Sequence, residues 1–254
     1  MAQRDPDGVL ERGNIYFLYR PKVEQKHPKG ERDIERFFMV MSPEGKKLYR
    51  EIIIGRKALP KVHNGGDRNW GFVKMVVRDP HDLVEEFKEA RYETKTRGTR
   101  EVGAARPAGE GVYAIVRHDD HTHLVYSLEL PEKPREVQRE LGIEDEASYI
   151  LSIKNPEKPA PQQAGLRGDQ KATYPYKLRE GFQDRRFIDA DPPDFLDYEG
   201  TEIMLIGAAE DPSEELGIEL DPEKETLSSA DIFKDLKLSR KEHPVKPLLE
   251  GKWE

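Results

Sequence analysis

Residues 109–131 read GEGVYAIVRHDDHTHLVYSLELP and hold the strongest strand signal in the chain. Two runs rich in Val, Ile, Leu and Tyr flank Asp119 and Asp120, and residues of these types are typical of strands. Aspartate tolerates the tight backbone geometry of a turn. The stretch therefore predicts a β-hairpin that turns at Asp119 and Asp120.

The register of this hairpin decides which face its histidines occupy. A turn centred on the two aspartates makes the numbers of opposed residues add up to 239, so His118 lies opposite His121. Strand alternation then places His118, His121 and His123 on one face. A three-residue turn changes the sum to 238 and moves His118 to the other face.

Three imidazoles on one face of a hairpin tip can bind zinc or manganese, with a further position open for water. The first register therefore predicts a metal site of His118, His121 and His123. The spacing HxxHxH matches no zinc-protease pattern such as HExxH. The alternative is a polar tip, with His118 and His121 in water and His123 packed against its neighbours.

A second group of titratable side chains, in FIDADPPDFLDYEG at 187–200, is rich in aspartate and proline. Carboxylates on an irregular backbone can bind a metal or orient histidines that do, although Asp and Pro are also common in plain surface turns. If these carboxylates shared a cleft with the histidines and with Arg97, Arg100 or Arg106, the chemistry would be metal-assisted hydrolysis of a phosphoester. Asp189 or Asp191 would then be the base, and Arg106 would stabilise the developing charge.

Composition excludes several other classes of protein. The chain has 254 residues and no cysteine, which rules out disulfides, thiolate metal sites and cysteine nucleophiles. No run of about 18 apolar residues is present, and the first residues, MAQRDPDGVLERGN, are too charged for a signal peptide. We therefore expect a cytoplasmic protein with no membrane partner.

Charge divides the chain into three parts. Residues 210–225 hold eight acids and one lysine, so they carry most of the net charge of −8. They predict an acidic connector, which either docks on a basic partner or is a solvated linker. Residues 1–209 then form one sheet-dominated domain, and residues 226–254 form a C-terminal arm.

The arm, residues 226–254, contains a pattern typical of a helix and several large apolar residues that we expect to be buried. Ile232, Phe233 and Leu236 have the spacing of a short amphipathic helix, whereas two prolines argue against a helix in 243–254. Leu248 and Trp253 would each cost about 1.5–3 kcal/mol if left in water. We expect the arm to pack on the core or on a neighbouring subunit, which would make a homo-oligomer.

Residues 91–106 form a basic stretch, with five basic side chains and two acids. Such a stretch can bind phosphate or a nucleic-acid backbone, but Tyr92 is its only aromatic residue, so support for nucleic acid is weak. The alternative is an ordinary solvated loop.

Several segments resemble a family of bacterial proteins that has no assigned activity. They are GNIYFLYRP, ARPAGEGVYAIVRH with HTHLVYSLELP, ASYILSIKNP and PPDFLDYEG, and together they span residues 13–208. The resemblance implies that this span is one structural unit. It assigns no catalytic residue.

These patterns together favour an α+β fold. We expect about eight strands in a predominantly antiparallel sheet or partly open barrel, with two or three short helices and the C-terminal arm, because successive strand signals are joined by hairpin turns. The function that fits best is a binding or interaction protein that uses its sheet and its long loops, such as 155–177. The alternative is the metal-dependent phosphoester hydrolase.

Overall fold

A computed structural model of the chain describes residues 8–62, 66–96, 98–160, 165–209, 216, 218, 220, 222, 225–226 and 229–253. Its strands are β1 (Val9–Pro21), β2 (Ile34–Pro43), β3 (Tyr49–Ile54), β4 (Arg68–Val77), β5 (Ala90–Thr94), β6 (Gly98–Val102), β7 (Arg106–His118), β8 (His121–Leu130), β9 (Glu146–Lys154), β10 (Phe187–Asp189) and β11 (Glu202–Ala209). Its α-helices are α1 (Pro80–Phe87), α2 (Glu136–Leu141), α3 (Tyr176–Glu180), α5 (Asp231–Asp235) and α6 (Lys246–Glu250). Short 3₁₀ helices are η1 (Glu31–Asp33), η2 (Gly168–Gln170) and η3 (Pro193–Asp197).

Eight antiparallel strands close into a barrel, in the order β9-β11-β4-β3-β2-β1-β7-β8, because β8 also pairs with β9. The expectation of an antiparallel, sheet-dominated fold is confirmed, but the expectation of a partly open barrel is wrong. Strand β9 is long enough to pair with β8 along its first half and with β10 along its second. The five short α-helices of the described residues also exceed the two or three expected.

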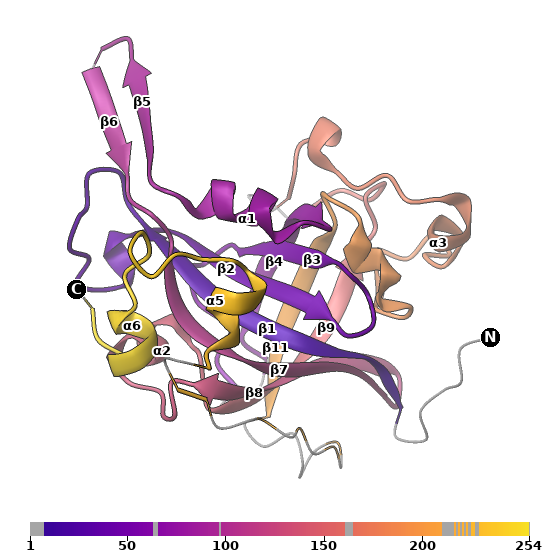
Figure 1. Cartoon of the computed structure of the whole chain (residues 1–254). Helices are drawn as coiled ribbons and strands as arrows, with labels where there is room; N and C mark the ends of the chain where they lie inside the picture. The colour runs from indigo at the N-terminus through magenta and orange to yellow at the C-terminus, as the bar shows by residue number, and fades with distance from the viewer. Residues whose placement is uncertain are drawn as a thin grey trace.

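The barrel consists of two meanders, each built from strands that pair in the order in which the chain forms them, with a long excursion between β9 and β11 (Figure 1). One is β1 to β4, and the other is β7, β8, β9 and β11. They meet at two seams, β1 with β7 and β4 with β11. Between them the chain forms α1 and the β5–β6 hairpin, which contribute no strand to the barrel.

The hairpin β7–β8 has the register in which opposed residues add up to 239. His118 lies opposite His121, and Val116 lies opposite His123. Asp119 in the turn has a φ of 51°, in the left-handed region that aspartate tolerates. The predicted position of the turn and the predicted register of the hairpin are confirmed.

Side chains fill the interior of the barrel. One buried cluster takes members from every barrel strand, which places it inside, and its large residues include Phe17, Tyr19, Phe37, Tyr113, Tyr126 and Tyr149. A second cluster lies outside, where α1 and the arm cover the outward residues of β1 and β2, among them Leu18 and Phe38. Both faces of β1 are thus covered, which explains its continuous apolar run IYFLY.

The C-terminal arm packs on its own barrel. Ile232 in α5 and Leu248 in α6 are fully buried, and the ring of Trp253 lies 5.2 Å from that of Tyr19, between centroids. The prediction of no helix in 243–254 is wrong, because α6 forms there. Pro247 lies in the first turn of α6, where its missing N–H is not needed.

Within the described ranges, no helix is both long enough and apolar enough to cross a membrane.

Candidate functional site

The three histidines of the hairpin tip share the outward face but do not converge. His123 is 3% exposed, and its Nδ1 lies 2.9 Å from Ser148 Oγ, while its ring contacts that of His118 edge-on at 5.8 Å. His121 is exposed, with Nε2 3.4 Å from Asp120 Oδ1. In the part of the chain that the structure describes, no group of three or more His, Asp or Glu side chains is arranged to hold a metal. A zinc or manganese site at His118, His121 and His123 stays a prediction without a preformed ligand set.

The aspartate segment reaches the same tip from the other side. Asp191 forms an ion pair with Arg117, and the N–H of Ala190 donates to Thr122 Oγ1 at 2.8 Å. Arg117 and Thr122 are opposed in the ladder and alternate with the histidine positions, so they belong to the opposite face. The hairpin ladder therefore separates Asp191, and the nearby Asp189 of β10, from the imidazoles.

Arg106 is remote from both groups. It begins β7, whereas His118 ends it, and twelve residue steps of a strand span about 40 Å. The guanidinium of Arg106 donates to the carbonyl of Lys26 at 2.7 Å. The residues of the hydrolase hypothesis therefore do not line one cleft, and Arg97, which the basic stretch also contains, lies outside the described residues.

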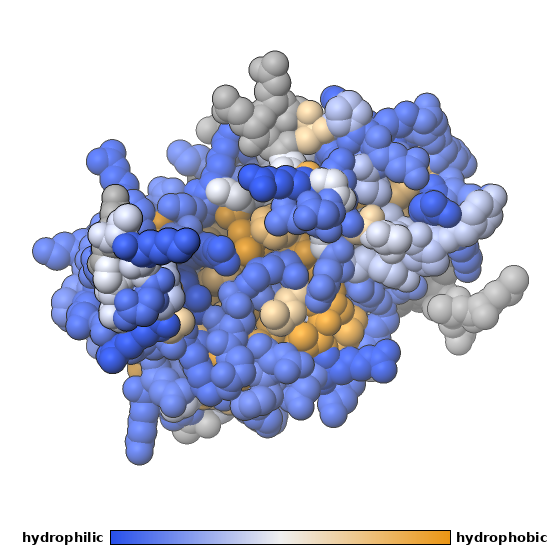
Figure 2. Space-filling view, turned by 90° about the horizontal axis from the view of Figure 1, so that it is seen from above, coloured by the Kyte–Doolittle hydropathy of each residue, from blue (hydrophilic) through white to orange (hydrophobic). Residues whose placement is uncertain are grey.

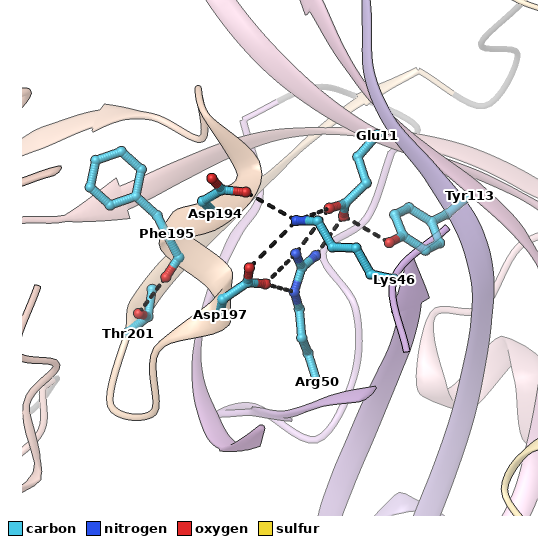
Figure 3. A network of polar contacts seen from close by, with 8 residues as sticks. All are labelled: Glu11, Lys46, Arg50, Tyr113, Asp194, Phe195, Asp197 and Thr201. Atoms are coloured by element: carbon cyan, nitrogen blue, oxygen red, sulfur yellow. Dashed lines mark hydrogen bonds and ion pairs between the residues drawn. The ribbon is translucent and has the colours of Figure 1, made fainter. Parts of the chain in front are cut away.

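A dense group of charges lies at one end of the barrel, and its residues were not among those predicted from the sequence (Figure 3). We call it the barrel-end network, and its members are Glu11, Lys46, Arg50, Tyr113, Asp194 and Asp197. The sequence signal that could have revealed it is Arg50, which alternates with Ile52 and Ile54 and so faces inward with them. A charged residue in phase with the core positions of a strand indicates a buried ion pair.

Arg50 is the centre of the network and has no exposed surface. It donates from Nη2 to Glu11 Oε2 at 2.9 Å and from Nε to Asp197 Oδ1 at 2.7 Å. Tyr113 donates its hydroxyl to Glu11 Oε1 at 2.8 Å. Burial is the largest single influence and would lower the pKa of Arg50, but the hydrogen bonds to Glu11 and the negative charges of Glu11 and Asp197 together outweigh it, so the pKa is raised. The guanidinium thus ties η3, which carries Asp197, to the barrel wall.

Lys46 forms the exposed end of the network. Its Nζ lies 3.0 Å from Asp194 Oδ1, 3.4 Å from Asp197 Oδ2 and 3.6 Å from Glu11 Oε2. Partial burial would lower the pKa of Lys46, but the hydrogen bond with Asp194 and the other two carboxylates raise it. The ammonium is therefore fixed in position and charged at the surface of the barrel.

A pocket of about 590 Å³ adjoins the network, and we call it the rim pocket. It is lined by Lys46, Lys47, Leu48, Val76, Arg78 and Asp197. Three of these are cations, and the single carboxylate is already held by Arg50. Leu48 and Val76 add apolar surface to this lining, so the pocket suits a ligand that is both anionic and apolar. Figure 2 views the molecule from above, where hydrophobic residues show among mainly hydrophilic ones.

Comparison of the chain with protein-family models, with curated proteins and with solved structures finds no match. No relative therefore indicates an activity, and the geometry of the barrel-end network and the rim pocket is the basis of the proposal below.

Proposed function

We propose that the protein is a binding protein that recognises an acidic, partly apolar segment of a partner protein at the rim pocket. The observation that carries the proposal is the charge of this pocket. Lys47 and Arg78 are exposed, and neither forms an ion pair with another described residue. Cations without a local counterion attract carboxylates on an approaching partner.

The apolar part of the pocket supports the same ligand chemistry. Leu48 and Val76 are partly buried and line the same pocket as the cations, so the pocket offers apolar surface beside positive charge. Protein interfaces commonly place apolar contacts at the centre and polar contacts around them. A segment that alternates acidic and apolar side chains satisfies both parts.

The interior of the barrel argues against a small apolar ligand. Barrels that carry such ligands hold them in a central chamber. Here aromatic side chains with no more than 1% exposure, such as Phe17, Tyr126 and Tyr149, fill that space. Recognition therefore takes place on the outer surface.

The barrel-end network supports binding by holding one wall of the pocket rigid. Arg50 fixes Asp197, and Asp197 with Asp194 fixes the ammonium of Lys46. A cation that is already ordered loses little side-chain entropy when a ligand binds.

A peptide titration tests the proposal. The probe is a synthetic peptide that alternates glutamate with leucine, and a peptide that alternates lysine with leucine is the control ligand. We expect the acidic peptide to shift the backbone amide resonances of Lys47, Leu48 and Arg78, with an affinity that falls as salt is added. The double variant Lys47→Glu/Arg78→Glu should weaken binding by about tenfold or more.

The matched control variant is Arg32→Glu, which reverses an exposed charge away from this pocket and should leave the affinity unchanged. Equal binding of both peptides, or equal affinity in the double variant and the wild type, would contradict the proposal.

A further inference from the structure

The β5–β6 hairpin, which we call the ribbon, stands away from the barrel (Figure 1). Among the described residues, β5 pairs only with β6, and four of its five residues are exposed. One contact at the base joins the ribbon to the segment after β1, because the N–H of Glu24 donates to the carbonyl of Glu101 at 2.9 Å. Within the ribbon, Arg91 Nη2 lies 3.0 Å from Glu101 Oε1 and so joins β5 to β6. The basic stretch 91–106 is therefore an ordered structure, although the sequence analysis considered a loop.

A ribbon of two strands has little stability of its own in water. Each strand of the ribbon also has an edge that faces away from the other strand, and such an edge offers backbone groups to any strand that fits beside it. Because proteins usually protect such edges, we expect a partner strand to pair with the exposed ribbon. The side chains of β5 indicate which partner fits.

The charges around β5 are arranged symmetrically about Tyr92. Residues 89–95 read EARYETK. Glu89 and Lys95 lie at equal distances on either side of Tyr92, and so do Arg91 and Glu93. Each acid is thus matched by a base at the mirrored position.

We propose that two copies of this chain associate through β5, edge to edge and antiparallel, with the two-fold axis at Tyr92. In this register Arg91 lies opposite Glu93 of the partner subunit, and Glu89 lies opposite Lys95 of the partner subunit. Two-fold symmetry produces each pair twice. The two ribbons become one four-stranded sheet in which the two Tyr92 rings meet.

The other edge of the ribbon does not fit a second copy in this way. An antiparallel pairing of β6 with itself about its middle residue places Arg100 opposite Arg100 of the partner subunit. Like charges directly opposite each other destabilise a pair of strands. The pattern of charges therefore favours β5 over β6 as the strand that pairs with a second copy.

Exposure of Tyr92 agrees with this interface. Among the described residues, Tyr92 and Tyr176 are the large apolar side chains that remain exposed, at 45% and 68%. The C-terminal arm, which the sequence analysis considered for oligomer contacts, is already buried on its own barrel. The proposal is independent of the rim pocket, because the ribbon contributes none of that pocket's residues.

Charge reversal tests the pairing by sedimentation velocity at low salt. We expect the wild type to be a dimer. Arg91→Glu and Glu93→Arg should each raise the dissociation constant of the homodimer by about tenfold or more, because each places like charges opposite. An equimolar mixture of the two variants should form a heterodimer, since every Glu then faces an Arg. Arg32→Glu, with the same charge change as Arg91→Glu, should behave as the wild type.

Cross-linking tests the position of the axis. The chain contains no cysteine, so Tyr92→Cys introduces a single thiol per chain. Opposed Cβ atoms in a β-ladder lie about 4.5–5.5 Å apart, close to the reach of a disulfide, so this variant should cross-link rapidly under mild oxidation. Tyr176→Cys is the matched control and should not cross-link. A monomeric wild type at all concentrations, a mixture of charge variants that stays monomeric, or equal cross-linking of the two cysteine variants would overturn the proposal.

Discussion

Glu110→Gln tests how the C-terminal arm is attached to the barrel. Glu110 in β7 has no exposed surface, and its Oε2 accepts a hydrogen bond from the N–H of Ile232 at 2.7 Å, at the start of α5. Burial, followed by the neighbouring Glu225 carboxyl, raises the pKa of Glu110 to about 9, although the hydrogen bond from Ile232 works in the opposite direction. This carboxyl is therefore protonated at neutral pH in the folded protein.

The raised pKa makes the folded state less stable as the pH increases. Between the ordinary value of 4.5 and about 9, the folded protein binds this proton and the unfolded chain does not. The free energy of unfolding thus falls through this window. From pH 4.5 to pH 7 the span is 2.5 units at about 1.4 kcal/mol each, so the upper limit of the loss is about 3.5 kcal/mol.

Glutamine at position 110 removes this loss. It is neutral at every pH, its carbonyl accepts from Ile232, and its amide donates to Glu225. We expect the free energy of unfolding of Glu110→Gln to match that of the wild type within about 1 kcal/mol at pH 5 and to exceed it by up to about 3.5 kcal/mol at pH 7.

Urea unfolding at pH 5, 7 and 8.5 measures the effect. A Trp70→Phe background leaves Trp253, which packs on Tyr19, as the fluorescent reporter of the arm. If wild type and Glu110→Gln lose stability in parallel between pH 5 and 8.5, Glu110 is not the group that titrates and the reasoning is refuted.

Three further predictions concern the barrel end, the strand packing and the histidines. Arg50→Ala removes the cation nearest to the buried Glu11 carboxylate, leaving only Lys46 at 3.6 Å, and should lower the free energy of unfolding by about 3–5 kcal/mol in urea titrations, partly restored by adding Glu11→Gln. Gly13→Ala places a Cβ 2.1 Å from the Ser42 carbonyl oxygen and should cost about 2–3 kcal/mol, whereas Gly45→Ala, with open space but a φ of 72°, should cost about 1 kcal/mol by the same measurement. Calorimetric titration with zinc should give the same weak signal for wild type and His121→Ala, and tight binding that this variant abolishes would instead establish the three-histidine site.

Local features of the sequence were sufficient to predict the β7–β8 hairpin. Two apolar runs and the turn at Asp119 lie within one short stretch, and the register follows once the turn is placed. The short helix α5 was predictable for the same reason, since the spacing of its apolar residues is local.

Closure of the barrel was not predictable, because it depends on contacts between distant segments. The β1–β7 seam pairs Gly13 with Tyr113, and a single sequence carries no sign of such a contact. The ribbon was also missed as a structure, since β5 and β6 are short and polar and lack the apolar alternation by which strands are recognised.

The candidate site was only partly visible. Sequence alone pointed to the histidines and aspartates, because clusters of titratable residues stand out when they are adjacent in the chain. The barrel-end network joins Glu11, Arg50 and Asp197, which are far apart in sequence and meet only when the barrel closes. Arg50 alternates with Ile52 along the strand, which indicates that it is buried, but no sequence feature marks Glu11 or Asp197 as its partners.

The division of the barrel into two meanders has a practical consequence. Each meander is held by its own hairpins, and the chain that links them crosses from one to the other through the ribbon. A cut in the turn of the ribbon would therefore interrupt no barrel strand and no hairpin of either half. Each fragment alone would expose two bare strand edges, and the edges that fit best are those of the other fragment. The protein is thus suited to fragment complementation, in which two separately produced polypeptides reassemble into one closed barrel.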